Sequence, residues 1–257
     1  MHVRFRTAVL AAALILLPAS LPAAQKNDAP AIDPVASQYL ARMCDYLKGL
    51  GSFSFRAEID VDEVFNGGLT LQTSRTEVIS VRRPDRLRAE SVQDDAVKTI
   101  IYDGTAFTIY NKTQNLYSTV AVPSTLDAAL DQILTSYGVT APLAELILNA
   151  PHAAITSGIL SGFYVGKRMV QGVACHHLAF TQKDVDWQIW IEDGDKPLPR
   201  KLVIVDKTLA GAPNYEAMLV DWKVNPRLKD SLFTFTPPKD AALIAIVPVA
   251  DPTTVSQ

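Results

Sequence analysis

Hydrophobic and polar residues alternate with a period of two along much of the chain. Between residues 53 and 62, apolar side chains alternate with serine and charged residues, which predicts a β-strand with one buried and one solvated face. The turn Asn66-Gly67-Gly68 follows, and similar segments recur at short intervals, separated by residues typical of turns. This part of the chain is expected to form a meander of β-hairpins.

A helical period appears before this meander. From residue 34 to residue 50, apolar residues recur every four positions, with Asp33 placed to cap the start and Gly49 and Gly51 to end the helix. The pattern predicts one amphipathic helix.

Between about residues 124 and 157 the pattern becomes helical again. Ser124 and Asp127 resemble a capping box at the start of a first helix, which ends before Gly138. Pro142 fits the first turn of a second helix, and a third short turn is expected after Pro151. These helices are brief and strongly apolar, so they need a sheet to cover.

Strands with antiparallel character resume after these helices. The order helix, strands, helices, strands, with no linker long enough to split the chain, predicts an α+β fold. We expect a large curved antiparallel β-sheet, an N-terminal helix, and short helices covering the concave face. Such an open half-barrel leaves a mouth for a ligand. The later predicted strands are residues 163–170, 173–182, 187–191, 202–206 and 215–224.

The N-terminus has the order of regions that is typical of a secretory signal peptide. Arg4 and Arg6 precede an uncharged run from Thr7 to Leu17, and small residues ending at Ala23 and Ala24 follow. The run of about 11 residues is shorter than the roughly 20 that span a membrane, which argues against a retained anchor. We expect a periplasmic, not membrane-spanning protein with a signal peptide at 1–24, a flexible leader at 25–33, a single domain at 34–240 and a flexible tail at 241–257.

The charge of the chain argues against nucleic acid as a partner. Of 24 basic residues, Arg4 and Arg6 lie in the predicted signal peptide, which leaves 22 against 27 acidic residues. Basic residues form no cluster, whereas phosphate binding depends on clustered lysine and arginine.

Two cysteines, Cys44 and Cys175, allow two interpretations. In an oxidising compartment they could form a disulfide. Cys44 shares a helical face with apolar residues and Cys175 lies in an apolar strand, so both could instead be small buried hydrophobic residues. The Cα separation that a disulfide requires is not given by the sequence, and both interpretations stay open.

Histidine chemistry in the predicted mature chain depends on His152, His176 and His177. A strand period of two places Cys175 and His177 on one face and His176 on the other. A thiol beside an imidazole could act as a nucleophile pair or supply two metal ligands, but metal sites need several convergent ligands. We therefore expect histidines that are hydrogen-bonded at the sheet.

Other candidate residues for chemistry are explained by turns. The acidic residues between Asp184 and Asp195 flank predicted hairpin turns, where aspartate is favoured by its own backbone hydrogen bonds. Calcium-loop, phosphate-loop, nucleophile-elbow and zinc-protease motifs are not found. The sequence therefore predicts no catalytic residues, no metal and no cofactor.

Aromatic and other apolar residues are the most conspicuous feature of the chain. A packed core explains most of them. A long curved sheet under short helices also offers apolar space, because such covers open at low cost. We expect the wall of this space on two strands and its lid on the helix that begins near residue 124. The expected ligand-binding residues are Phe53, Phe55, Ile59, Leu130, Ile133, Met218, Val220 and Trp222.

Several motifs resemble those of a known family. They are Arg82 to Leu87, Tyr102 to Gly104, Gly172 to Phe180, Asp186 to Gly194, Pro197 to Ile204 and Phe233 to Pro238. Over residues 35–238 the chain resembles domain of unknown function 2092, a bacterial family of predicted periplasmic proteins. That family is similar in fold to lipoprotein carriers of the LolA and LolB type, whose half-barrel has an apolar concave face under a helical lid. The resemblance implies apolar-ligand binding or lipoprotein handling, and carries over no functional residue.

Three functional hypotheses follow. The first is a non-catalytic periplasmic carrier that binds a lipid or the acyl chain of an acylated protein. The second is a structural or docking module that binds another envelope protein through a sheet edge or a helix face. The third is an enzyme that acts through Cys175 and His177. A cavity between sheet and helices favours the first hypothesis, and a solidly packed interface favours the second.

Overall fold

The structure is a computed structural model that describes residues 31–139 and 141–248. The predicted signal peptide, most of the predicted leader and the end of the predicted tail lie outside the described residues.

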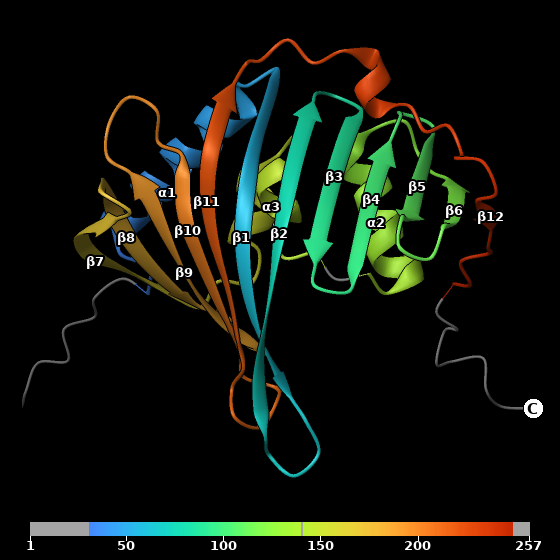
Figure 1. Cartoon of the computed structure of the whole chain (residues 1–257). Coiled ribbons are helices and arrows are strands. Elements are labelled where there is room, and N and C mark those ends of the chain that lie inside the picture. Colours follow the sequence, from blue (N-terminus) through green and yellow to red (C-terminus); the bar gives the residue numbers. More distant parts are fainter. Residues whose placement is uncertain (1–30, 140, 249–257) are drawn as a thin grey trace, which may run out of the picture.

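Within the described residues, twelve strands form one open sheet (Figure 1). They are β1 (Ser52–Val64), β2 (Thr70–Arg82), β3 (Arg86–Gln93), β4 (Ala96–Tyr102), β5 (Ala106–Asn111), β6 (Leu116–Ala121), β7 (Ser161–Val170), β8 (Val173–Thr181), β9 (Val185–Glu192), β10 (Pro199–Asp206), β11 (Asn214–Val224) and β12 (Ala242–Leu243). Their order is β12-β6-β5-β4-β3-β2-β1-β11-β10-β9-β8-β7. The pairing of β1 with β11 joins the two meanders, and neighbouring strands are antiparallel except β12, which runs parallel to β6. The predicted α+β fold with a large, mainly antiparallel sheet is confirmed.

The α-helices lie on one side of this sheet, behind it in Figure 1, and the sheet curves around them. They are α1 (Pro34–Lys48), α2 (Leu126–Tyr137), α3 (Ala144–Ile147) and α4 (Pro151–Thr156). One hydrophobic cluster contains buried residues of all four helices and of the strands beneath them, so the helices are held by burial of their apolar faces. No helix within the described ranges is long and apolar enough to cross a membrane.

The helix caps agree with the sequence in one case and differ in another. The Asp33 side chain accepts a hydrogen bond from the Val35 amide at 2.8 Å, as the predicted cap of α1 requires. The predicted capping box of α2 is wrong, because the N-cap is Thr125 and not Ser124. The Asp127 carboxylate instead accepts hydrogen bonds from the amides of Asn149 and Ala150, and so ties α2 to the segment after α3.

The alternation in β1 directs its apolar residues toward the helices. Phe53, Phe55, Ala57 and Ile59 are at most 1% exposed, while the residues that alternate with them are partly exposed. On the same face of β2, Arg75 lies opposite Ile59, and Glu77 is the next residue along that face. The concave face is therefore apolar under the helices and becomes polar toward the β1–β2 hairpin.

Both ends of the described chain contact the sheet. Ile32, within the predicted flexible leader, forms a parallel bridge with Gly162 at the edge strand β7. At the other end, Phe235 packs on Tyr110 and Tyr117, with ring centroids 5.5 and 5.3 Å away. Strand β12 then pairs with β6, although a flexible tail was expected from residue 241, because the backbone edge of β6 accepts these hydrogen bonds.

Candidate ligand cavity

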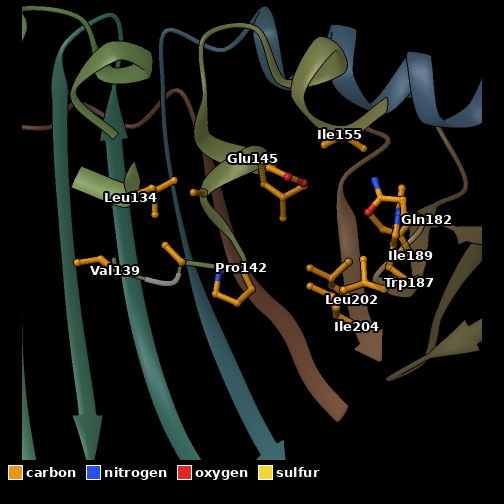
Figure 2. A pocket seen from close by; sticks show the side chains of 14 residues that line it. Leu134, Val139, Pro142, Glu145, Ile155, Gln182, Trp187, Ile189, Leu202 and Ile204 are labelled. Carbon is orange, nitrogen blue, oxygen red and sulfur yellow. The ribbon is translucent and has the colours of Figure 1, made fainter. Parts of the chain in front are cut away.

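A cavity of about 360 Å³ lies between the concave face of the sheet and the α3 region (Figure 2). Trp187 and Ile189 of β9 and Leu202 and Ile204 of β10 form its sheet side. Its helix side is also apolar and is formed by Leu134, Val139, Ala141, Pro142, Ala144, Leu146 and Ile155. Ligand sites are concave and mostly apolar, with a few polar groups, and this cavity has that character.

Two further cavities adjoin the first. The second, of about 120 Å³, shares Leu134, Val139 and Pro142 with the first and extends beneath α2. The third, of about 470 Å³, shares Arg75 and Ile100 among others with the second and reaches the polar part of the concave face. Together they form one groove that runs from an apolar end to a polar end.

Glu145 is the titratable group in the lining of the first cavity. Figure 2 shows its side chain pointing toward the apolar residues of the sheet. The residue is exposed, but neighbouring protein atoms remove part of its hydration, and this desolvation raises the pKa of the Glu145 carboxyl. Within the described ranges, no ion pair involves Glu145.

Polar groups gather where the second and third cavities meet. Arg75 Nε lies 2.8 Å from Glu77 Oε1, and both side chains are largely buried. The Arg75 guanidinium carbon lies 5.9 Å from the ring centroid of Tyr215, which lines the second cavity. The Tyr215 hydroxyl is buried and has no hydrogen-bond partner among the described residues, and burial raises its pKa. An unpartnered buried hydroxyl is costly unless something else binds it.

The predicted wall residues on β1 lie in the solid core. Phe55 stacks on Trp222 with centroids 4.4 Å apart, and Phe53 lies 6.0 Å from the same ring. Ile59 is also buried on this face. None of these four side chains is part of the lining of the three cavities described above. The two predicted lid residues, Leu130 and Ile133 of α2, do line a cavity, the second one.

The predicted wall on β11 is divided between the two faces of the sheet. Trp222 faces the core, whereas Met218 and Val220 alternate with the buried residues Ala217 and Leu219 and therefore point to the opposite face. The change occurs at Asp221, which has a φ of 55° and lies where the register between β1 and β11 shifts. Placing Met218 and Val220 with Trp222 assumed an uninterrupted strand, and this β-bulge makes that assumption wrong.

Sequence reasoning missed most of the residues that line the first cavity. Trp187 and Leu202 alternate correctly within predicted strands, so their burial was predictable. Pro142 and Leu146 lie about 50 residues away along the chain. Only the pairing of β9 with β10 and the position of α3 bring these residues around one space.

His176 is buried by packing and hydrogen bonds. Its Nδ1 lies 3.0 Å from the Tyr164 hydroxyl and its Nε2 lies 2.9 Å from Asp193 Oδ1. The imidazole also stacks on Tyr39 of α1 with centroids 3.6 Å apart. These contacts fasten α1 to β7 and β8, so His176 has the hydrogen-bonded role expected from the sequence.

Cys175 and His177 do not form a nucleophile pair. Cys175 Sγ donates to the Val173 carbonyl at 3.5 Å, while His177 Nε2 lies 2.9 Å from Gln188 Oε1. Desolvation lowers the pKa of His177. No group of three or more histidine, cysteine, aspartate or glutamate residues suited to a metal occurs in the described part of the chain. The third functional hypothesis therefore has no support in this geometry.

Both cysteines are free thiols and at most 1% exposed. Of the two interpretations of the sequence, the structure agrees with small buried hydrophobic residues. Desolvation raises the pKa of Cys44 to about 12 and that of Cys175 to about 11.

Neither thiol is expected to react with Ellman's reagent at pH 8 in the folded protein, because the thiolate is the reactive species. Both should react in urea. The measurement is the absorbance released before and after unfolding. A thiol that reacts in the folded protein would contradict its burial, and fewer than two thiols in urea would indicate a disulfide.

The fold and the cavity together define an α+β protein whose curved sheet encloses an apolar groove under short helices. The chain belongs to the family of predicted periplasmic proteins (DUF2092), whose family model matches residues 36–247. The family resemblance stated from the sequence motifs is confirmed.

Comparison with solved structures gives weak similarities in fold. An uncharacterized conserved protein of Thermus thermophilus is 12% identical, with a TM-score of 0.47 over 82% of this chain and 98% of that chain. Lipoprotein LppX of Mycobacterium tuberculosis is 13% identical, with a TM-score of 0.40 over 77% and 98%. MucB in the Pseudomonas aeruginosa MucA/MucB complex is 17% identical, with a TM-score of 0.40 over 78% of this chain and 61% of that chain. No protein of curated function matches the sequence. Similarity at this level says nothing about a ligand.

Proposed function

We propose that this protein is a non-catalytic periplasmic binding protein that shelters the alkyl chain of a lipid or of an acylated protein. The observation that carries this proposal is the apolar cavity between β9, β10 and the α3 region. Its volume of about 360 Å³ lies within the range of ligand sites, roughly 300–1,000 Å³.

Burial of an alkyl chain in this cavity supplies enough free energy for useful affinity. Each buried methylene contributes about 0.8 kcal/mol. The ordering of the chain and the loss of its free motion oppose this gain. Affinity is therefore expected to increase with chain length until the groove is full.

The test fills the cavity with a side chain. Ala141 is exposed and lines both the first and the second cavity, so an indole at this position has room to occupy the space that a ligand needs. Ala141→Trp is expected to weaken binding of the neutral fluorophore N-phenylnaphthylamine at least about tenfold, or ~1.4 kcal/mol. Fluorescence titration measures the affinity, and dodecanol should displace the fluorophore from the wild-type protein.

The matched control is Ala153→Trp. Ala153 is exposed on α4 and is absent from the linings of the three cavities, so this variant should bind as the wild type does. Equal affinities of Ala141→Trp and the wild type, or a wild type that binds no fluorophore, would contradict the proposal.

A second candidate function is docking of another envelope protein, which the outer edge of β7 favours. Phe163 and Met169 of this edge strand are 56% and 65% exposed. Apart from the bridge at Gly162, the outer edge of β7 has no partner strand in the ranges described. Free edges accept an extended segment of another protein. A protein that binds no fluorophore and forms a stoichiometric complex with one envelope protein would favour docking over ligand binding.

A further inference from the structure

The two ends of the groove differ in charge. At the apolar end, Glu145 is the titratable residue in the lining of the first cavity. At the polar end, the third cavity contains Arg75, Glu77 and Lys98. Arg75 and Glu77 compensate each other in an ion pair, whereas Lys98 is exposed and is in no ion pair among the described residues. The polar end therefore carries one net positive charge and the apolar end one negative charge.

Strand register shows how sharply the surface changes. Glu77, Ser91, Lys98 and Asn111 face one another across the neighbouring strands β2, β3, β4 and β5. Two residues further along each strand, the corresponding row is apolar and contains Ile79, Ala89, Ile100 and Ile109. Two residues along a strand correspond to about 7 Å. On these four strands the wall of the groove therefore changes from apolar to polar over about 7 Å in the direction of the strands.

Tyr215 is the second observation that points to a polar ligand group. Its side chain lines the middle cavity beside Arg75 and is 9% exposed, and its hydroxyl has no partner within the described ranges. A ligand oxygen in the middle cavity would accept a hydrogen bond from this hydroxyl and remove the cost of leaving it unpaired.

We infer that the ligand is an anionic amphiphile, an alkyl chain with one carboxylate or phosphate, bound with its chain beneath α3 and its charged group beside Lys98 and Arg75. This inference rests on the proposed function and names its ligand class and orientation. The reverse orientation would place the anion beside Glu145, where like charges repel and where the lining of the first cavity has no basic residue. Because Glu145 is exposed, solvent weakens this repulsion without changing its sign. The charges of the two ends thus select both the sign of the headgroup and its direction.

The experiment compares three amphiphiles of equal chain length: dodecyl phosphate, dodecanol and dodecyltrimethylammonium. The two charged compounds are kept below their critical micelle concentrations and dodecanol below its solubility. Each compound is titrated into the wild-type protein loaded with N-phenylnaphthylamine at low ionic strength, and the loss of fluorescence gives its affinity. Dodecyl phosphate is expected to bind tightest and the cation weakest. Lys98→Gln should weaken binding of dodecyl phosphate about fivefold and leave dodecanol unchanged, because an exposed lysine contributes a modest charge interaction.

The matched control is Lys223→Gln. Lys223 is also exposed but is absent from the linings of the three cavities, so this variant should keep the affinity and order of the wild type. The same titration with dodecanoate distinguishes a carboxylate headgroup from a phosphate headgroup. Equal binding of dodecanoate and dodecyl phosphate indicates recognition of negative charge alone, and tighter binding of the phosphate indicates a phosphorylated headgroup.

The outcomes separate this inference from the function on which it rests. Equal affinities for the three amphiphiles, or a Lys98→Gln variant that loses phosphate and alcohol equally, would overturn the inference and leave the proposed function standing. A wild-type protein that binds none of the three, including the neutral alcohol, would overturn both.

Discussion

Replacing Phe55 by alanine is expected to lower the free energy of unfolding by about 3–5 kcal/mol, the range for truncating a buried phenylalanine. Phe55 is 1% exposed and stacks on Trp222, with Phe53 on the same face of β1. The substitution removes the ring from the centre of this cluster and leaves a void that the neighbouring aromatic rings fill only in part. Urea denaturation should show a lower midpoint at an unchanged dependence on urea concentration.

Met218→Ala is the control for this prediction. Met218 was grouped with Phe55 from the sequence, but it lies half-buried on the opposite face of the sheet. Its truncation should cost about 1 kcal/mol or less, as is usual away from the core. If Phe55→Ala retained wild-type stability and instead lost affinity for dodecanol, Phe55 would belong to a ligand site and the description of this cluster as solid core would be wrong.

Strands and helices could be predicted from the sequence, because burial of one face makes apolar residues recur at a fixed spacing along the chain. The predicted helix at residues 34–50 is α1 at Pro34–Lys48, and the alternation from Phe53 onward is the buried face of β1. These features depend on neighbours within a few residues, so a single sequence contains them.

The composition of the cavity depends on contacts that no local period specifies. The bulge at Asp221 follows from the way β11 pairs with β1, which lies more than 150 residues earlier in the chain, and it reverses the faces of the residues on either side. Likewise, the lining joins β9 and β10 to Pro142 and Leu146 through tertiary packing. The existence of apolar space under the helices was therefore predictable, while most of its lining was not.

Polar residues on the concave face were overlooked for a related reason. In the sequence, Arg75 and Glu77 have the pattern of the solvated face of a strand. Neighbouring residues in the sequence do not distinguish a charge that faces solvent from one at the end of a groove. The register of β2 with β1 places them on the same face as Ile59 and Ala57. Lys98 joins this surface through β3.

Arg83 connects the helical layer to the sheet and is the second residue whose loss should have a large effect. Its Nη1 donates to the Ile147 carbonyl at 2.8 Å and to Asn149 Oδ1 at 3.0 Å, and its Nη2 donates to the Leu47 carbonyl at 3.4 Å. Leu47 and Ile147 lie in the last turns of α1 and α3, where carbonyls lack partners within the helix. The guanidinium also lies 5.3 Å from the Phe53 ring centroid, and desolvation lowers the pKa of Arg83.

Arg83→Ala is expected to lower the free energy of unfolding by about 1–3 kcal/mol, because it leaves the Ile147 carbonyl at the end of α3 without its donor. The Leu47 carbonyl keeps the hydrogen bond from the Leu50 amide at 3.2 Å. Lysine cannot reach all three acceptors with one ammonium group, so Arg83→Lys should recover less than half of the loss. Arg82→Ala is the matched control. The Arg82 guanidinium pairs with Asp230, donates to the Leu228 carbonyl at 3.1 Å and lies 5.2 Å from the Phe233 ring centroid. None of these contacts involves the helical layer, so this variant removes a guanidinium without releasing α3.

Hydrogen exchange separates a local role of Arg83 from a general loss of stability. If Arg83 holds the helical layer on the sheet, amides of α3 should exchange faster in Arg83→Ala than in Arg82→Ala, while the central strands β1 and β11 keep their protection under native conditions. The same loosening should weaken binding of N-phenylnaphthylamine, since Ala144 and Leu146 of α3 line the first cavity. A variant that lost no stability and kept slow exchange in α3 would show that packing alone positions this helix over the groove.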